Sequence, residues 1–482
     1  MNGISLLIGT GVPLFGSFLM PVLGRINKKL RNAASLAFVL VSLCCAVFSL
    51  VKLLGGETVS TGDFPVPFGL SFGFTADALA LFMAITATVV SSVIIIYSYG
   101  YMKEYENQNE YYMMVTLFIG AMTGLVYSTG LIMIYTFWEL SSLCCWRLIG
   151  FYREEITVRR ADKAFIVTVL GALIMLVGFM GIYGETGTLC MTELRGTHIS
   201  DWCVVCILFG ILSKSATFPL HNWLPDAGVA PSPVTSLLHA AVLVKIGVFA
   251  YARLFVMTFE INSDFTTVVP VIAAVSALIS AGAALKAMDI KRVVAYSTIS
   301  QLAFILLGLS CGTKVGFVGG LLYILSHSVA KGGLFLCCGI VEHNCHTKDM
   351  NKISGLIRTM PCTAVAFILC AFSVMGIPPF SGFFAKYMVI EGAVDAGQIW
   401  IAAVFIFGAV MTVMYLTRLF VKVFLGPQSF PEAKEHSPVM VASVLPLGIF
   451  ALLLGLLIYF PSSLAELSLG DAVAFESIGE VI

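Results

Sequence analysis

The sequence predicts an all-α membrane protein with about fourteen transmembrane helices, and three observations support this fold class. The 482 residues are 59% hydrophobic and only 11% charged, whereas soluble domains carry about 25% charged residues. Apolar stretches recur along the chain at close to the length that crosses a bilayer. Basic residues gather in alternate connections, as they do on the cytoplasmic side of membrane proteins. A soluble fold is therefore excluded, and the net charge of zero gives no indication of a nucleic-acid partner.

The apolar runs between polar breaks define the expected spans. They lie near residues 4–24, 32–54, 76–99, 111–128, 130–150, 164–184, 201–230, 233–255, 267–287, 293–311, 315–341, 361–394, 400–423 and 440–461. The seventh and twelfth are too long for one plain span of about 20 residues. The first run is too long for the hydrophobic region of a signal peptide, so we expect it to remain as the first span.

Spans four to eight and nine to thirteen show a matching hydropathy pattern and enter the membrane from opposite sides, as in inverted-repeat transporters. The expected organisation has four parts. These are an N-terminal three-helix region (1–110), a first five-helix repeat (111–255), a second five-helix repeat (267–423), and a C-terminal helix with a tail (424–482).

Basic residues predict the orientation. With the N-terminus outside, eighteen lysines and arginines of loops and span ends fall inside, and only Lys52, Arg195, Arg253 and Lys314 fall outside. Both termini are therefore expected on the non-cytoplasmic side of the cell inner (plasma) membrane, in a multi-pass protein.

No cofactor or metal site is expected. Most of the thirteen cysteines lie in apolar runs, where a thiol packs as a small hydrophobe. Cys203 and Cys206 form one C-x-x-C without a second pair, and a solvated loop is the favoured interpretation of His343, Cys345 and His346 over a metal site. There is no phosphate-binding loop and no iron–sulfur cysteine run, so any redox chemistry must belong to another subunit.

Five basic residues fall inside the predicted spans: Arg147, Lys214, Lys245, Lys331 and Lys386. Arg147 lies near a span end and can extend to the interface. A charged lysine at a helix centre costs about 2.5–3.5 kcal/mol on the most lenient scale, so the four lysines would cost about 10–14 kcal/mol. They are tolerable only in the bundle interior, with partners or without their protons, which favours a functional role.

Glu139 is the one carboxylate placed deep within a span. Burial disfavours the charged form of both Glu139 and Lys214, so a pair that forms and breaks could donate and accept a proton; a static pair joining two helices is the alternative. His327 and Lys331 are four residues apart on one helix face, which suits a relay. His239 and Lys245 are six apart and point in different directions, so His239 is either a hydrogen-bonded core histidine or part of the pathway.

Two proline-containing breaks accompany two of these lysines. Residues 214–219 precede a polar turn at 221–226, and residues 376–382 precede Lys386. Proline interrupts a helix, and free carbonyls at mid-membrane are tolerated only beside a cavity or inside the protein. The two long spans are therefore expected to be broken helices beside an ion site.

Four segments carry a family resemblance. Residues 214–227 (KSATFPLHNWLPDA), 231–241 (PSPVTSLLHAA), 289–301 (DIKRVVAYSTISQ) and 376–386 (GIPPFSGFFAK) resemble the antiporter-like subunits of respiratory complex I, group 4 membrane-bound hydrogenases and Mrp-type cation/proton antiporters. The resemblance covers about span four to span twelve and implies fourteen helices, two inverted repeats and broken helices 7 and 12. It also implies an ion pathway through Glu139, Lys214, His239, Lys245, His327, Lys331 and Lys386.

Departures from the family pattern indicate which type of antiporter-like subunit the chain resembles. Lysine at 245 and 386 resembles chain N, the D-type Mrp protein or a hydrogenase subunit more than chain M, and the lateral helix of chain L is not expected. Arg147 stands where the family has an apolar residue.

The resemblance implies a proton- or sodium-translocating subunit of a redox-driven complex, with other antiporter-like and redox membrane subunits as partners and no redox centre of its own. Two alternatives remain open: a subunit of an Mrp-type cation/proton antiporter, and a structural subunit without transport.

Overall fold

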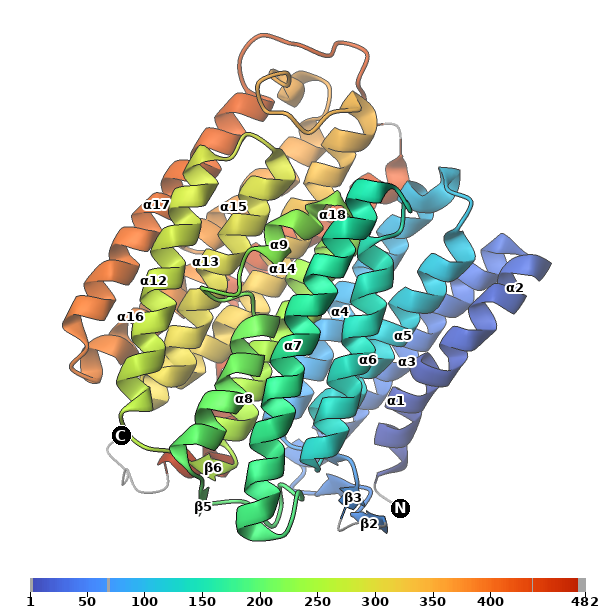
Figure 1. Ribbon diagram of the computed structural model, residues 1–482. Helices are drawn as coiled ribbons and strands as arrows, with labels where there is room; N and C mark the ends of the chain where they lie inside the picture. Colours follow the sequence, from blue (N-terminus) through green and yellow to red (C-terminus); the bar gives the residue numbers. More distant parts are fainter. Residues whose placement is uncertain (1–2, 67–69, 436, 476–482) are drawn as a thin grey trace.

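A single bundle of long, nearly parallel helices forms the protein (Figure 1). The computed structural model describes residues 3–66, 70–435 and 437–475. The first half contains α1 (Ile4–Gly16), α2 (Met20–Ile26), α3 (Lys28–Leu54), α4 (Ala78–Tyr101), α5 (Gln108–Tyr127), α6 (Leu131–Ile149), α7 (Glu155–Thr186), α8 (Asp201–Lys214), α9 (Trp223–Asp226), α10 (Ser232–Ser236) and α11 (Leu243–Tyr251). The second contains α12 (Phe265–Lys286), α13 (Ile290–Ser310), α14 (Lys314–Cys345), α15 (Pro361–Met375), α16 (Ser381–Asp395), α17 (Ile399–Phe424), α18 (Pro438–Leu456) and α19 (Tyr459–Leu467).

The few strands are short and lie at one end of the bundle (Figure 1). They are β1 (Val59–Ser60), β2 (Phe64–Val66), β3 (Leu70–Phe72), β4 (Thr75–Ala76), β5 (Thr197–His198) and β6 (Phe259–Glu260). β1 pairs with β4 and β2 with β3 in antiparallel ladders, and β5 pairs with β6 in parallel. We call this end, which also carries the start of α14, the strand end, and the other, which carries the end of α14, the opposite end.

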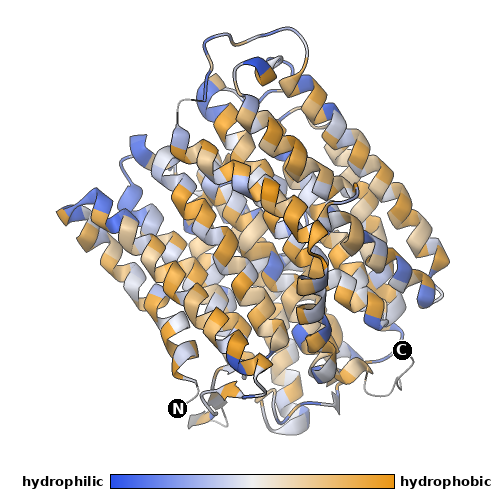
Figure 2. Cartoon of the chain, turned by 180° about the vertical axis from the view of Figure 1, so that it is seen from behind, coloured by the Kyte–Doolittle hydropathy of each residue, from blue (hydrophilic) through white to orange (hydrophobic). Residues whose placement is uncertain are grey.

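Ten helices in the described part of the chain are long and apolar enough to cross a membrane. In Figure 2 the hydrophobic residues cover the sides of the bundle and the hydrophilic ones gather at its two ends, as a bilayer requires. Residues 232–256 and α14 are buried almost throughout, whereas α1 and α17 expose much of their length. The helix of His327 and Lys331 therefore lies inside the protein.

Caps set several helix boundaries. Asp77 accepts a hydrogen bond from the Ala80 amide at the start of α4, and Asp289 accepts from the amides of Lys291 and Arg292 at the start of α13. Gly376, with φ +79°, ends α15 in the left-handed conformation that favours glycine.

Two expectations about the spans were incomplete. α7 begins at Glu155, well before the expected start at 164, because its first turns are polar and held by pairs such as Arg159–Glu155, which an apolar count misses. The eighth span is not a plain helix, because π-helical segments at Leu237–Ala241 and Ala252–Val256 flank α11. π-Helical segments are rare in proteins as a whole, and those that occur are often found at functional sites.

Candidate functional site

Both expected helix breaks are present, and a lysine lies beside each. α8 ends at Lys214 and the next helix, α9, starts at Trp223. α15 ends at Met375 and α16 starts at Ser381, five residues before Lys386. A break frees the last carbonyls of a helix, which carry partial negative charge. These carbonyls can therefore bind a cation.

Lys386 makes this contact directly. Its Nζ donates to the Val374 carbonyl at 2.8 Å and approaches the Met375 carbonyl at 3.5 Å. The same atom lies 4.8 Å from the centre of the Phe304 ring and 5.9 Å from that of Tyr323. Carbonyl dipoles and ring faces thus replace water around this ammonium group.

Lys214 is fully buried against α6. Its Nζ donates to the Trp138 carbonyl at 3.1 Å and to Ser142 Oγ at 2.6 Å, and lies 5.2 Å from the centre of the Trp138 ring. Residues 138 and 142 are one turn apart, so they present one surface to the lysine.

Glu139 does not form the expected direct pair with Lys214. No nitrogen–oxygen contact within 4.0 Å joins them among the described ion pairs, and Glu139 Oε1 is buried without a hydrogen-bond partner. Residue 139 lies about 100° around α6 from Trp138, so the surface that binds Lys214 turns this carboxylate aside.

The second cluster forms where α11 meets α14. Lys245 Nζ lies 2.5 Å from His327 Nδ1 and 3.5 Å from the His239 carbonyl. The π-helical segment Leu237–Ala241 contains His239 and changes the angular relation that a plain helix would give His239 and Lys245, so the lysine turns back toward that carbonyl. Both ring nitrogens of His239 and Nε2 of His327 are buried without a hydrogen-bond partner. The His239 ring packs on Phe335 at 4.5 Å.

Lys331 points to a different neighbour than His327, although both lie on α14. Its Nζ donates to Ser297 Oγ at 2.5 Å and to the Val294 carbonyl at 3.3 Å, both on α13. The expected shared face does not bring His327 and Lys331 into contact, because each side chain reaches across to a separate helix.

Hydroxyl and amide groups outside the predicted ion pathway contact these residues or one another. They are Ser142, Ser297, Gln301, Tyr323, Thr412 and Tyr415. Ser297 and Gln301 lie in the family-like segment 289–301. An amide inside an apolar span is costly unless it is hydrogen-bonded, and that cost was a second signal for Gln301.

The cation line consists of Lys214, Lys245, His327, Lys331 and Lys386. Arg147, whose role the sequence did not explain, lies outside it. It pairs with Glu110, which also binds Arg153 at 2.8 Å. The half-exposed cluster holds the end of α6 against the start of α5.

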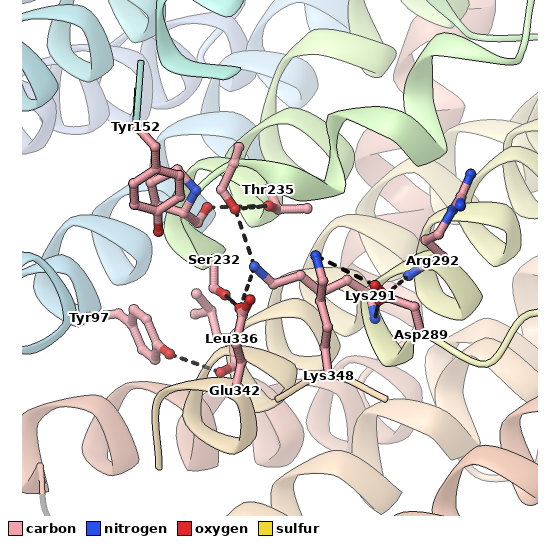
Figure 3. Close-up of polar contacts among 12 residues, drawn as sticks. Tyr97, Tyr152, Ser232, Thr235, Asp289, Lys291, Arg292, Leu336, Glu342 and Lys348 are labelled. Atoms are coloured by element: carbon pink, nitrogen blue, oxygen red, sulfur yellow. Dashed lines mark hydrogen bonds and ion pairs between the residues drawn. The ribbon is translucent and has the colours of Figure 1, made fainter. Parts of the chain in front are cut away.

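Ion pairs with carboxylates lie at the ends of the bundle. Figure 3 shows Lys291 beside Glu342, with 2.5 Å between Nζ and Oε2, while Ser232 donates to the same carboxylate at 3.1 Å. Lys291 also donates to the Ala230 carbonyl at 3.2 Å, and its side chain is only 2% exposed. This cluster fastens α10, α13 and α14 at the opposite end.

A cavity of about 220 Å³ opens near the strand end, and its lining includes the charged residues Asp77, Arg195, Arg253 and Asp471. Arg253 binds both carboxylate oxygens of Asp77, one at 2.8 Å. Burial alone would raise the pKa of Asp77, but the charge and hydrogen bonds of Arg253 outweigh it and hold that pKa below its ordinary value. Burial and the nearby Asp77 charge raise the pKa of Asp471, against the opposing charges of Arg195 and Arg253.

Comparison with known proteins places this site in a family. Residues 128–412, more than half of the chain, match the family described as NADH:quinone oxidoreductase/Mrp antiporter, TM. The chain belongs to this family. Residues 62–112 match a second family, described as NADH-Ubiquinone oxidoreductase (complex I), chain 5 N-terminus. The expected resemblance is confirmed, and the chain is an integral membrane protein.

Two similar proteins are named as subunits of a sodium/proton antiporter. The chain is 30% identical to Na(+)/H(+) antiporter subunit A1 of Staphylococcus haemolyticus (strain JCSC1435) and to that of Staphylococcus aureus (strain JH9). Each alignment covers 94% of the chain and 61% of the relative, so the chain spans about three fifths of the relatives' length. From Lys245 and Lys386 we expected a resemblance to chain N, the D-type Mrp protein or a hydrogenase subunit. Both of these relatives are instead of the A1 type.

Two solved structures share the fold. One is the Mrp complex from Dietzia sp. DQ12-45-1b, with a TM-score of 0.88, 24% identity and 98% of each chain covered. The other is the membrane-bound sulfane sulfur reductase, an archaeal respiratory membrane complex, with a TM-score of 0.90, 24% identity and 100% of each chain covered.

Proposed function

We propose that this chain is an ion-translocating, antiporter-like subunit of a multi-subunit complex in the plasma membrane. The ion, a proton or sodium, would move by way of Glu139, Lys214, His239, Lys245, His327, Lys331 and Lys386. Counting α5, α6, α8 with α9, and α15 with α16 beside the ten apolar helices would give the fourteen expected. The two repeats would then be 111–255 and 267–423, between an N-terminal region 1–110 and a C-terminal region 424–482.

One observation carries this proposal: the four lysines of the pathway are held by carbonyls, hydroxyls, a histidine and ring faces instead of carboxylates. They are Lys214, Lys245, Lys331 and Lys386. No ion pair in the described part of the chain includes them. A permanent structural strut would need a counter-charge, because an uncompensated buried charge costs several kcal/mol. A buried amine without a counter-charge can also lose its proton, which a proton carrier requires.

The geometry suggests an order of steps. The Glu139 side chain would rotate toward Lys214, where its negative charge stabilises the protonated form of that lysine. When Glu139 rotates away, Lys214 can release the proton. Lys245 and His327 already exchange a hydrogen bond, so a proton can pass between α11 and α14. In the described residues no side-chain hydrogen bond joins Lys214 to Lys245, so that step would need water. Moving one charge against 100 mV costs about 2.3 kcal/mol, comparable to making or breaking one such contact.

The orientation is also part of the proposal. The basic groups of the opposite end would face the cytoplasm and the strand end would face outward. The chain termini, residues 1–2 and 476–482, lie outside the described residues.

The energy source has two candidates. Identity of 30% with Na(+)/H(+) antiporter subunits favours exchange of sodium for protons. The fold shared with a respiratory reductase complex is the observation for a redox-driven pump. A purely structural subunit is the third possibility, and the absence of carboxylate partners along the described cation line argues against it.

Purification from native membranes in mild detergent, followed by mass spectrometry and vesicle transport assays, tests the proposal. Small hydrophobic antiporter subunits and sodium-driven proton movement would favour the antiporter. Copurified iron–sulfur subunits, with proton movement on electron-donor addition, would favour the pump. A complex that moves neither ion under either drive would refute both.

A further inference from the structure

Five buried polar side chains from three helices form one network between Lys331 and Lys386. They are Ser297 and Gln301 on α13, Tyr323 on α14, and Thr412 and Tyr415 on α17, and none is more than 1% exposed. α17 contributes no residue to the ion pathway above, so its two polar groups need a separate explanation.

The hydrogen bonds from Lys331 run in one direction. Lys331 donates to Ser297, and Ser297 Oγ lies 2.8 Å from the Tyr415 hydroxyl. Tyr415 donates to Thr412 at 3.3 Å. A hydroxyl donates only one hydrogen, so Ser297 must donate to Tyr415 in this arrangement. Thr412 in turn donates to the Gly408 carbonyl at 2.8 Å, so every hydrogen points away from the ammonium group.

Gln301 joins this chain to the surroundings of Lys386. Its Nε2 donates to Tyr415 and Thr412, each at 3.2 Å, and its Oε1 accepts from the Tyr323 hydroxyl. The Tyr323 ring is one of the two rings beside the Lys386 ammonium group. The orientation of one amide is therefore fixed by Tyr415, which Ser297 joins to Lys331, and by Tyr323, whose ring lies beside Lys386.

We propose that this network is a positioning device that couples the proton occupancy of Lys331 to that of Lys386, an inference that rests on the proposed function. When Lys331 loses its proton, its amine becomes an acceptor and Ser297 can donate to it. Tyr415 then donates to Ser297, and its hydrogen is withdrawn from Thr412. This reversal changes the hydrogen bonds around Gln301. Because Gln301 also binds the Tyr323 hydroxyl, the change reaches the Tyr323 ring beside Lys386.

Single-hydroxyl variants test the coupling in the assembled complex in native membranes, with transport rates divided by the amount of complex. Ser297→Ala and Tyr415→Phe are expected to lower the transport rate about tenfold and to shift its pH profile, since misplaced groups slow transfer strongly. The double variant should be no slower than either single one, because both interrupt one chain. Ser297→Thr keeps the hydroxyl and should retain transport. Tyr111→Phe is the matched control, since it removes an equally buried hydroxyl, bonded to Ser98, outside the network.

Normalised rates and pH profiles of Ser297→Ala and Tyr415→Phe equal to those of Tyr111→Phe would overturn the inference, even if less complex assembled. Lys386→Ala is measured alongside. If it abolishes transport while the hydroxyl variants do not, the inference alone fails. If Lys386→Ala also transports normally, the proposed function fails with it.

Discussion

Lys245 and His327 face each other across α11 and α14 with 2.5 Å between Nζ and Nδ1. Two full positive charges cannot be held so closely in a buried site, so at least one of these groups is neutral while the contact exists. The contact is then a single hydrogen bond that joins α11 to α14.

Replacing His327 with glutamine tests this contact, because glutamine keeps hydrogen-bonding capacity but does not titrate. We expect the transport rate to fall about a hundredfold, the scale on which lost acid–base groups act, with the complex still assembled. The rate is measured as pH change in vesicles. His343→Gln, near the end of α14, is the control and should transport normally. Unchanged transport in His327→Gln would remove this residue from the pathway.

Lys386→Met should separate transport from stability. Since no carboxylate is left unpaired, replacing this ammonium group with an apolar side chain of similar length should leave the thermal unfolding midpoint unchanged or raise it, while transport is lost. Unfolding is followed by intrinsic fluorescence in detergent. A clear fall in the midpoint would show that Lys386 is a structural strut.

Glu342→Gln should have the opposite effect. It leaves Lys291, only 2% exposed, without its counter-charge, which costs about 3–5 kcal/mol of unfolding free energy for a buried pair. The thermal midpoint and the amount of assembled complex should both fall. Glu155→Gln removes an exposed pair with Arg159 and should change neither. Equal stability of the two variants would contradict the structural role of the Lys291–Glu342 cluster.

Asp77→Asn should lower stability in a pH-dependent way. The pKa of Asp77 is held below its ordinary value, so its stabilising contribution is present above the unfolded pKa of about 3.9 and is lost as pH falls through the lowered folded value. The midpoint of Asp77→Asn should lie below that of the unmodified protein at pH 7, and the difference should shrink under strong acid.

Asp471→Asn is the contrasting variant. The pKa of Asp471 is raised, so its contribution is favourable below the unfolded pKa and lost as pH rises through the folded value. The unfolding midpoint of Asp471→Asn, relative to that of the unmodified protein, should therefore be higher at pH 8 than at pH 4. The same pH trend in both variants would contradict the assigned charges of this cavity.

Much of the fold was predictable because lipid imposes a simple rule on composition. Apolar run length located the long helices, and the prolines near 219 and 378 located the two breaks. The π-helical segment at Leu237–Ala241 was not predictable, because an apolar stretch looks alike whether its hydrogen bonds span four residues or five. The short strands between α3 and α4 lack any long alternating pattern.

The cations of the site were predictable because a charge in an apolar span is costly, but their partners were not. Lys386 binds carbonyls that only the folded break exposes, and Lys214 binds the surface of α6 beside Glu139 instead of Glu139 itself. Serine, threonine and tyrosine are common in spans, so nothing in the sequence distinguished Tyr415 from ordinary packing residues. Ser297 lies in the family-like segment 289–301, but that segment gave it no role of its own.

Ion transport by the native complex carrying Lys214→Ala tests most directly whether ions move along the buried lysines, with exposed Lys352→Ala as the matched control. Initial rates are measured in vesicles and divided by the amount of assembled complex. If buried Lys214 belongs to the ion pathway, the Lys214→Ala complex assembles but does not transport ions, and the control transports normally. Normal transport in Lys214→Ala would contradict the claim that ions move along this line of buried cations.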